Sequence, residues 1–335
     1  MKYLIPIPEL RRTDVALAGG KGASLGELIA AGARVPPGYV VTSQAYRAYL
    51  EYNNLDKLVA RLDRGEGNPF SIVAEIRERI LAGDIPPELD EHLRRVEEEF
   101  LDDYLAVRSS ATYEDSPDFS FAGIHDTYLG VRGSDVRAYV KRVWASNFVE
   151  RAVSYKLDNK IPPSKVLMAV VIQKLIDPVS AGVAFSLNPT TGDKSVVAIE
   201  SSWGLGEAVV SGEVTPDRFY VSKVTGEIIK RVISDQKTKK YALRDGAVVE
   251  EELPPDETSR PSLTDEQALR IADVVMRLER YYGHPVDVEW AYGDDVYVLQ
   301  SRPETVWSKK AVHKWESSGD IIKDIVRTLM SIKSK

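Results

Sequence analysis

The chain has 335 residues, of which 43% are hydrophobic and 28% charged, an ordinary composition for a globular protein with room for two lobes. The formal net charge of −7 argues against a general nucleic-acid or membrane-surface binder, and no apolar run approaches the length of a membrane span. The absence of cysteine excludes disulfides, thiolate metal sites and cysteine nucleophiles. With no signal-peptide pattern at the N-terminus, we expect a cytoplasmic protein.

The first motif that could carry chemistry is the glycine-rich stretch Gly19-Gly20-Lys21-Gly22, which follows a short extended segment. We expect a loop leading into a helix that begins near Ser24, because Ser24 and Glu27 have the spacing of a capping box. Glycines would let the backbone approach an anion, and Lys21 would add a mobile positive charge. The stretch lacks the G-x-x-x-x-G-K-[ST] pattern, and GGKG alone more often marks an ordinary loop with an exposed lysine.

The rest of the first half predicts one helical layer between two strands. Residues 35–42 read as a turn entering a short buried strand, and residues 43–104 as mostly helical. Residues 105–112 predict a strand that ends in a hydroxyl-rich segment, with Arg108 acting either as a structural ion-pair partner or as a phosphate clamp. The glycine- and hydroxyl-containing residues 121–129 predict either a loop that wraps phosphate oxygens or a plain hairpin.

The second half is richer in strands. Residues 135–156 predict a single amphipathic helix, and residues 263–282 predict another, capped by Thr264. Between them, apolar runs and turn residues predict strands at 166–173, 181–186 and 195–200, and hairpins with charged tips over 222–255.

The last motif, residues 286–303, alternates apolar and polar residues around a turn at Gly293-Asp294 and predicts a β-hairpin. With an even-numbered loop, Asp287 falls opposite Gln300. One face then carries two carboxylates, an amide and a guanidinium (Asp287, Glu289, Gln300, Arg302), and the other carries Val288, Trp290 and Leu299. The polar set suits Mg²⁺ beside a phosphate. For a hairpin taken alone, an Asp287–Arg302 ion pair with a solvated Glu289 is the simpler interpretation.

Seven segments occur in one order that resembles a known family: GGKGASLGEL, VPPGYVVT, AVRSSATYED, FAGIHDTYL, VAFSLNPTTGD, WGLGEAVVSGEVTPDRF and DVEWA…VYVLQSRPET. Together they look like the N-terminal ATP-binding region of phosphoenolpyruvate synthase, and are similar to pyruvate phosphate dikinase and rifampicin phosphotransferase. The resemblance implies an α+β, ATP-grasp-like fold in which two lobes clamp ATP. We expect an N-terminal lobe at 1–160, a C-terminal lobe at 161–307 and an amphipathic tail at 308–335.

The resemblance also implies roles in ATP binding. Lys21 and Arg108 would hold the phosphates, and the loop from Gly123 to Thr127 would cover them, with Thr127 supplying a hydroxyl. The sequence departs from many relatives at Ile124-His125, where they have two glutamines, so the loop would bind phosphate here through its backbone. Three residues would bind the nucleoside: Gln173 and Leu175 at the adenine, and Glu207 at the ribose.

For the chemical step, the resemblance implies that Glu289 and Gln300 bind Mg²⁺ and that Arg302 stabilises the charge of the transferring phosphoryl group. Asp287 would be an outer ligand or a general base. Phosphoryl transfer needs mainly positioning, a metal ion and cations around the equatorial oxygens, which agrees with these assignments.

What is missing indicates a partner. The full enzymes pass the phosphoryl group to a histidine in a swivelling domain, and none of the four histidines here lies in such a glycine- and serine-rich motif. We expect a pyruvate, water dikinase-like phosphotransferase that is incomplete without a phosphohistidine domain or subunit in trans, either as a separate subunit or as part of a longer enzyme. The alternatives are a related enzyme with another final acceptor, such as a phenol or an antibiotic, and a nucleotide-binding regulatory subunit without turnover.

The tail beyond the resemblance has its own pattern. Seven apolar residues repeat at helical spacing between Ile321 and Ile332, and seven basic against three acidic residues give the tail a net charge of +4. The pattern predicts a C-terminal helix. It either packs on its own lobe or docks the chain that carries the histidine.

Overall fold

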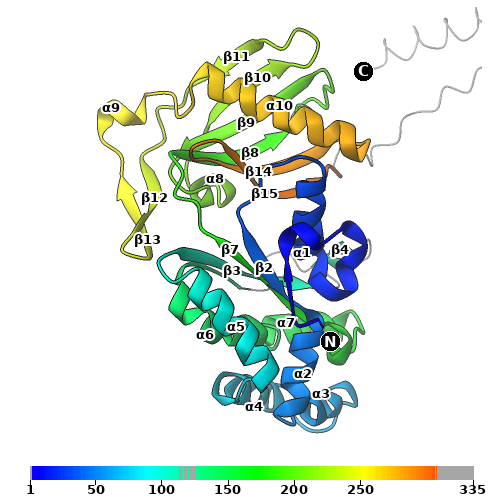
Figure 1. Cartoon of the computed structure of the whole chain (residues 1–335). Coiled ribbons are helices and arrows are strands. Elements are labelled where there is room, and N and C mark those ends of the chain that lie inside the picture. The colour runs from blue at the N-terminus through cyan, green and yellow to red at the C-terminus, as the bar shows by residue number, and fades with distance from the viewer. Residues whose placement is uncertain (1, 113–114, 117–118, 121–125, 306, 308–335) are drawn as a thin grey trace, which may run out of the picture. The chain divides into compact units, whose positions relative to one another are not determined.

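The computed structural model describes the chain except for residues 1, 113–114, 117–118, 121–125, 306 and 308–335. Met1–Pro303 form one compact unit and Glu304–Lys335 a second. The predicted tail helix falls within residues 308–335 and so lies outside the described residues. The first unit mixes helices with antiparallel sheets, which confirms the α+β class (Figure 1). Among the described helices, none is long and apolar enough to cross a membrane.

The first sheet has five antiparallel strands in the order β1-β2-β7-β3-β6, namely β1 (Leu4–Pro6), β2 (Gly38–Val41), β7 (Met168–Lys174), β3 (Tyr104–Ala111) and β6 (Thr127–Arg132). Apolar side chains on one face join a helical layer in a single core: α2 (Ser43–Tyr52), α3 (Asp56–Asp63), α4 (Pro69–Ala82), α5 (Pro87–Glu99), α6 (Val136–Ser146) and α7 (Glu150–Asp158). The predicted helical layer and strands are confirmed. The boundary expected at residue 160 does not separate the sheets, because β7 lies between β2 and β3.

Helix α1 (Val15–Ala30) packs on the other face of this sheet and corrects the prediction of a glycine-rich loop. The helix already contains the glycine-rich stretch, and its only break is at Gly19, where φ is +70°. Ser110 of β3 causes this break, because a Cβ on Gly19 would lie 2.1 Å from the Ser110 carbonyl oxygen. The Ser110 hydroxyl donates to the Ala18 carbonyl at 2.7 Å and accepts from the Gly22 amide at 3.0 Å. A second helical section thus begins just before Lys21, not at Ser24.

The helix predicted over 135–156 is two helices, α6 and α7, separated at Asn147. The Asn147 side chain is fully buried and donates to the hydroxyl of Tyr46 at 2.9 Å and to the carbonyl of Val166 at 3.1 Å. Its backbone and side-chain oxygens both accept from the buried amine of Lys156 at 2.6 Å. These tertiary bonds hold the chain in a bend that helical periodicity alone does not predict.

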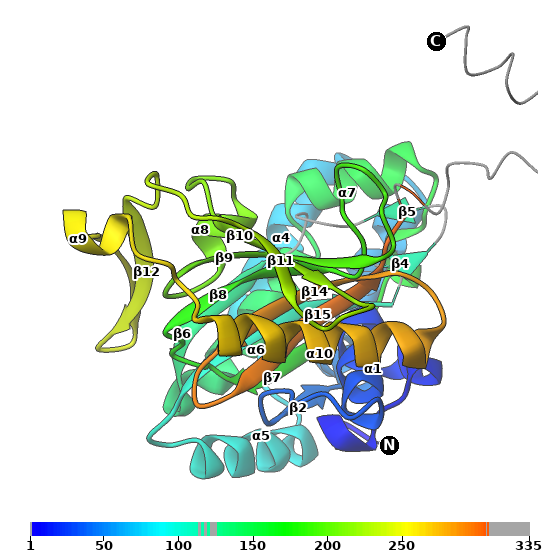
Figure 2. The same cartoon turned by 90° about the horizontal axis from the view of Figure 1, so that it is seen from above.

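The second sheet has six antiparallel strands in the order β11-β10-β9-β8-β14-β15: β11 (Ile228–Val232), β10 (Asp217–Ser222), β9 (Val196–Trp203), β8 (Ser180–Phe185), β14 (Val286–Tyr292) and β15 (Val296–Pro303). Helix α10 (Asp265–Tyr282) covers one face, as Figure 2 shows from above. Thr264 caps this helix and forms a capping box with Gln267, which confirms the prediction for this segment.

The remaining elements are short: the hairpin β12 (Lys239–Arg244) and β13 (Ala247–Glu252), the strands β4 (Asp115–Ser116) and β5 (Phe119–Ser120), the helices α8 (Glu207–Val210) and α9 (Pro255–Thr258), and 3₁₀ turns at Ile7–Glu9, Arg12–Asp14, Gly133–Asp135 and Pro163–Lys165. The chain passes from the first sheet to the second through residues 175–179, between β7 and β8. The face of the second sheet opposite α10 and the α1 face of the first sheet supply the site described next.

Candidate functional site

A cavity of about 300 Å³ lies between the two sheets. It gathers five of the residues singled out from the sequence, from four segments: Arg108 on β3, Thr127 on β6, Gln173 and Leu175 at the end of β7, and Glu289 on β14. Apolar and small side chains make up much of the remaining wall, namely Pro36, Ala106, Leu129, Ile176, Pro178, Ala181, Gly182, Leu205, Gly206, Trp290, Ala291 and Leu299. A mostly apolar cavity with a few convergent polar groups is the usual form of a small-molecule site.

One end of the cavity is formed where β7 leaves the first sheet. The Gln173 amide is buried and donates to the Pro36 carbonyl at 3.1 Å. The Leu175 amide donates to the Tyr104 carbonyl at 2.8 Å, and the Lys174 amine pairs with Asp103 at 2.6 Å. These bonds hold the connection between the sheets along the cavity wall, so its side chains and backbone meet a ligand in one defined arrangement.

The cationic groups lie beside one another. The Lys21 amine donates to the carbonyl of Ser109 at 3.0 Å, next to Arg108 in the chain. Arg108 reaches the second sheet, where Nη1 donates to the Leu299 carbonyl at 3.1 Å and Nη2 donates to Oε1 of Gln300 at 3.2 Å. Lys21 does not line the cavity itself but stands at the start of the second section of α1, where helix amides also favour an anion.

The β14–β15 hairpin confirms the shared polar face but corrects its register. Asp287 lies opposite Arg302, and Glu289 lies opposite Gln300. The cause is a β-bulge, because Trp290 pairs with Val298 and leaves Leu299 as the extra residue. The bulge compensates for a three-residue turn, so all four polar side chains keep one face. Leu299 lines the cavity, and its predicted place on the opposite face was wrong.

The bulge is held by residues from the first part of the chain. The Val298 amide donates to the Arg34 carbonyl at 2.8 Å, while Arg108 binds the Leu299 carbonyl. The Arg34 guanidinium pairs with Asp294 at 2.9 Å and lies 4.3 Å from the Tyr297 ring centre. Bulges beside functional sites re-aim side chains, and this one makes Glu289 and Gln300 direct neighbours.

The next residue of the turn, Asp295, is bound from the other side. Arg270 of α10 donates to both carboxylate oxygens of Asp295, at 2.5 and 2.7 Å. These bonds lower the pKa of Asp295 to about 2. The turn is therefore fixed between α10 and the segment that follows α1.

The ion pair of the simpler interpretation is present. Arg302 Nε lies 3.4 Å from Asp287 Oδ2, and the Arg302 side chain is 66% exposed. Glu289, by contrast, is half-buried and lines the cavity instead of being solvated. The Asp287 side chain is only 19% exposed, but because Arg302 is open to solvent the pair contributes roughly 0–1 kcal/mol and does not prevent Arg302 from turning toward a ligand.

The donor set at the hairpin is small and would hold Mg²⁺ only together with water and phosphate oxygens. Among the described residues, no group of three or more His, Asp or Glu side chains could hold a metal. Glu289 and Gln300 offer a carboxylate and an amide oxygen side by side across the two strands. Mg²⁺ at nucleotide sites keeps several waters and binds substrate phosphates through one or two protein oxygens, so this pair is a sufficient donor set.

Two of the predicted residues, Gly123 and Glu207, are not placed in the site by the described part of the structure. Gly123 lies outside the described residues, as does most of its loop. Glu207 begins α8 directly after Gly206 of the cavity wall, but its side chain is also outside what the structure describes. Most of the apolar wall residues were not singled out from the sequence, and Trp290 and Leu299 were assigned to the opposite face of the hairpin. The sequence signals that could have indicated these wall residues are two stretches rich in small residues, Ala181-Gly182 and Gly204-Leu205-Gly206.

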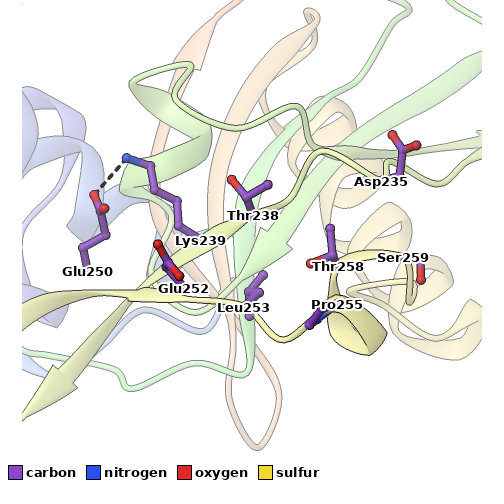
Figure 3. Close-up of a pocket in the computed structure, with 9 residues that line it drawn as sticks. All are labelled: Asp235, Thr238, Lys239, Glu250, Glu252, Leu253, Pro255, Thr258 and Ser259. Carbon is purple, nitrogen blue, oxygen red and sulfur yellow. Dashed lines mark hydrogen bonds and ion pairs between the residues drawn. The ribbon is translucent and has the colours of Figure 1, made fainter.

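A second cavity, of about 530 Å³, lies between the base of the β12–β13 hairpin and α9 (Figure 3). Its polar lining includes three carboxylates (Asp235, Glu250, Glu252) and Lys239, whose amine pairs with Glu250 at 2.8 Å. No residue singled out from the sequence lines it. The larger cavity is therefore not the candidate site.

Comparison with known proteins identifies the family of the chain. The sequence matches the family described as pyruvate phosphate dikinase, AMP/ATP-binding domain, over residues 15–320. It is 40% identical over 361 aligned residues to the probable phosphoenolpyruvate synthase of Staphylothermus marinus, covering 96% of this chain and 43% of that protein. It is 42% identical over 320 residues to the one of Methanothermobacter thermautotrophicus, covering 91% and 46%.

A relative with another name is also similar. The rifampicin phosphotransferase of Bacillus cereus is 37% identical over 312 residues, covering 90% of this chain and 36% of that protein. The chain thus spans less than half the length of these relatives. By its match over residues 15–320, the chain belongs to the pyruvate phosphate dikinase AMP/ATP-binding domain family.

Proposed function

We propose that this chain is the ATP- and Mg²⁺-dependent half of a phosphotransferase, which clamps ATP between its two sheets in the ATP-grasp manner and phosphorylates a histidine on another domain or chain. The reaction would be that of phosphoenolpyruvate synthase, in which pyruvate, ATP and water give phosphoenolpyruvate, AMP and phosphate. The observation that supports this most is the convergence of Arg108, Thr127, Gln173, Leu175 and Glu289 on one cavity from four segments.

The two ends of the cavity suit the two ends of ATP. Leu175 and the neighbouring apolar wall suit a flat adenine, and Gln173 and the connecting backbone offer hydrogen-bonding groups at its edge. Arg108 and Lys21 would take the phosphates, the first as a planar fork and the second as a mobile charge. Thr127 would add a hydroxyl from β6, the loop that includes Gly123 would cover the phosphates, and Glu207 would bind the ribose.

Glu289 and Gln300 would hold the magnesium ion, which when bound would neutralise phosphate charge. Arg302 would then leave Asp287 and turn to the transferring group, where its guanidinium stabilises the charge spread over the equatorial oxygens. Asp287 would help to orient the metal site or accept a proton.

The reaction is incomplete within this chain under the proposal. Forming AMP breaks the bond between the β-phosphorus and the bridging oxygen, which leaves with AMP. The group that carries the β- and γ-phosphorus atoms must then pass to an acceptor, where the water of the overall reaction releases the γ-phosphate. None of the four histidines lies in a swivelling-domain motif, and the chain covers 43% of its synthase relative, so the acceptor histidine would come from a further domain or chain. This activity uses intracellular ATP, and we place the chain in the cytoplasm.

A second candidate shares the first half-reaction. The similarity to rifampicin phosphotransferase, 37% identical over 312 residues, favours a variant in which the phosphohistidine serves another acceptor, such as a phenol or an antibiotic. A regulatory subunit without turnover has less support, because Lys21, Arg108, Glu289, Gln300 and Arg302 are all present.

The proposal is tested in two steps. Calorimetry should show ATP binding that is strengthened by Mg²⁺ and weakened by a chelator of divalent ions. With ATP labelled at the β-phosphate, Mg²⁺ and a histidine-bearing synthase domain added in trans, label should appear on that domain together with AMP. Without the added domain no AMP should form, and the chain alone should make no phosphoenolpyruvate from pyruvate. Absence of ATP binding, or product formation by the chain alone, would contradict the proposal.

A further inference from the structure

The β12–β13 hairpin belongs to neither large sheet and forms a two-stranded sheet of its own. Its turn is Asp245-Gly246, with φ angles of +48° and +85°, a common choice for tight hairpins. In Figure 1 the hairpin extends from the region of α8 and α9 toward β3. It therefore links the two sheets at a place separate from the β7–β8 connection.

The root of the hairpin is fixed to the second sheet. Asp217 of β10 and Lys237 form an ion pair at 2.6 Å in which both side chains are fully buried. The amides of Ser234 and Ser262 also donate to the Asp217 carboxylate, at 2.9 and 2.7 Å. Separating a buried ion pair leaves uncompensated charges in the interior, so this end of the hairpin does not detach in the folded protein.

The flank of the hairpin is bound to the cavity wall of the second sheet. The Leu205 amide donates to the Tyr241 carbonyl at 2.8 Å, and both Leu205 and Gly206 line the cavity. The approach is close, since a Cβ on Gly204 would lie 2.4 Å from the Tyr241 carbonyl oxygen. Glu213, just beyond α8, accepts from the Tyr241 hydroxyl at 2.9 Å and pairs with Lys239 at 2.6 Å. The hairpin is therefore bound firmly to the Leu205–Gly206 wall, and the two are expected to move together.

The tip of the hairpin rests on the opposite wall. A Cβ on Gly130 of β6 would lie 2.1 Å from the Gly246 carbonyl oxygen and 3.4 Å from a methyl group of Leu243. A Cβ on Gly246 would lie 2.3 Å from the Tyr104 ring. Gly130 and Leu129 form a bulge opposite Ala106, and both Leu129 and Ala106 line the cavity. The tip thus packs against the bulge that shapes this wall.

The two ends of the hairpin differ in the strength of their attachment. Between the tip and strands β3 and β6, all of which lie in the described part of the chain, there is close packing but no hydrogen bond or ion pair. Root and flank, by comparison, carry a buried ion pair and several hydrogen bonds. If the walls separate, the contact that breaks is at the tip.

We propose that the β12–β13 hairpin is a positioning element of the nucleotide cavity. It holds the Leu205–Gly206 wall against the Leu129–Gly130 wall and slows the release of nucleotide. This inference rests on the proposed function, because it assumes that the cavity holds ATP. Release of a nucleotide from between two sheets requires them to part, and the hairpin moves with the second sheet while its tip leaves Gly130 and Tyr104.

Two substitutions weaken the tip contact from opposite sides. Leu243→Asp puts a carboxylate against β6, and Tyr104→Ala removes the ring under Gly246 while leaving the backbone carbonyl that binds Leu175. Val224→Asp is the matched control, because Val224 lies at the turn of the β10–β11 hairpin and is 85% exposed. The measurement is the rate at which bound radiolabelled Mg·ATP exchanges with excess unlabelled Mg·ATP, with the thermal unfolding midpoint recorded for each variant.

We expect each tip variant to speed exchange about fivefold, because changes at a contact act mainly on the dissociation rate, and the double variant to add little, because both remove one contact. Unchanged exchange in variants that still bind ATP overturns the inference and leaves the proposed function standing. The same rise in Val224→Asp also overturns it, because the effect is then not specific to the tip. If the unmodified chain binds no ATP, the proposed function fails and takes this inference with it.

Discussion

Arg108 and Gln300 are joined by a hydrogen bond in which Nη2 of the arginine donates to Oε1 of the glutamine at 3.2 Å. Under the proposed function the same oxygen would bind Mg²⁺, so cation and arginine compete for it. A bound cation would release that arm of the guanidinium for a phosphate, while the other arm stays on the Leu299 carbonyl. Metal and phosphate binding would thereby favour each other.

The first prediction concerns Glu289. Removing this carboxylate by Glu289→Ala should weaken Mg·ATP binding by well over tenfold, roughly 2 kcal/mol or more, because a charged metal ligand is lost. Metal-free ATP binding should change much less, and calorimetry with and without Mg²⁺ separates the two. Glu200→Ala is the matched control, since Glu200 lies in the same row of the sheet two strands away and pairs with Arg218. Equal effects of the two variants would remove Glu289 from the metal site.

The second prediction concerns Arg302. If it acts on charge that develops during transfer, Arg302→Lys should lose more in the rate of transfer to a histidine-bearing domain than in ATP affinity, because lysine lacks the planar fork. Arg218→Lys, which also alters an arginine paired with a carboxylate on this sheet, should change neither quantity. A loss in affinity alone would make Arg302 a ground-state clamp, and no loss at all would leave it only the ion pair with Asp287.

The third prediction concerns the turn that supports the bulge. Arg34→Glu sets a like charge against Asp294 and should loosen the segment whose carbonyl binds the Val298 amide. We expect Mg·ATP affinity to fall about threefold to tenfold, which corresponds to roughly 1 kcal/mol. Arg270→Glu reverses charge at the neighbouring Asp295 from α10, away from the bulge, and should have a smaller effect. If Arg270→Glu weakens binding as much, the turn as a whole matters and Arg34 has no special role.

The fourth prediction concerns Lys156, whose buried amine has a pKa lowered to about 7 by loss of solvation. In the unfolded chain the pKa returns to its ordinary 10.5, so between these values the unfolded state binds more protons. The free energy of unfolding should therefore rise with pH from about 7 to about 10, by up to ~1.4 kcal/mol per pH unit. Chemical denaturation across this range should show a shallower slope in Lys156→Met. Identical slopes would mean that the folded protein keeps this amine charged.

The fifth prediction concerns the break in α1. Gly19→Ala should destabilise the protein by about 3 kcal/mol or more, because a methyl group would overlap the Ser110 carbonyl at a positive φ. Gly32→Ala is the matched control: φ is +80° there, but no atom lies within 4 Å of the added Cβ, so only the backbone cost of about 1 kcal/mol applies. Thermal or denaturant unfolding gives both values, and equal losses would show that the Ser110 contact carries no weight.

The sequence by itself determined most elements and the polar face of the last hairpin. Alternation with a period of two predicts that Glu289 and Gln300 share a face, and a cap such as Thr264 with Gln267 uses residues three apart. These signals are local, so they can be recognised without knowing the fold. The adenine and ribose residues came from the family resemblance instead, because Gln173 and Leu175 look like any strand end.

Only the tertiary structure decided the register and the breaks. The bulge at Leu299 depends on the Arg34 carbonyl and the Arg108 guanidinium, both more than 150 residues away in the chain. Likewise, α1 breaks at Gly19 because Ser110 stands against it, and the helix predicted over 135–156 divides at Asn147 because Tyr46 and Val166 bind its side chain. Each of these features satisfies a buried polar group with a partner from a distant segment, and such a partner leaves no periodic mark on the local sequence.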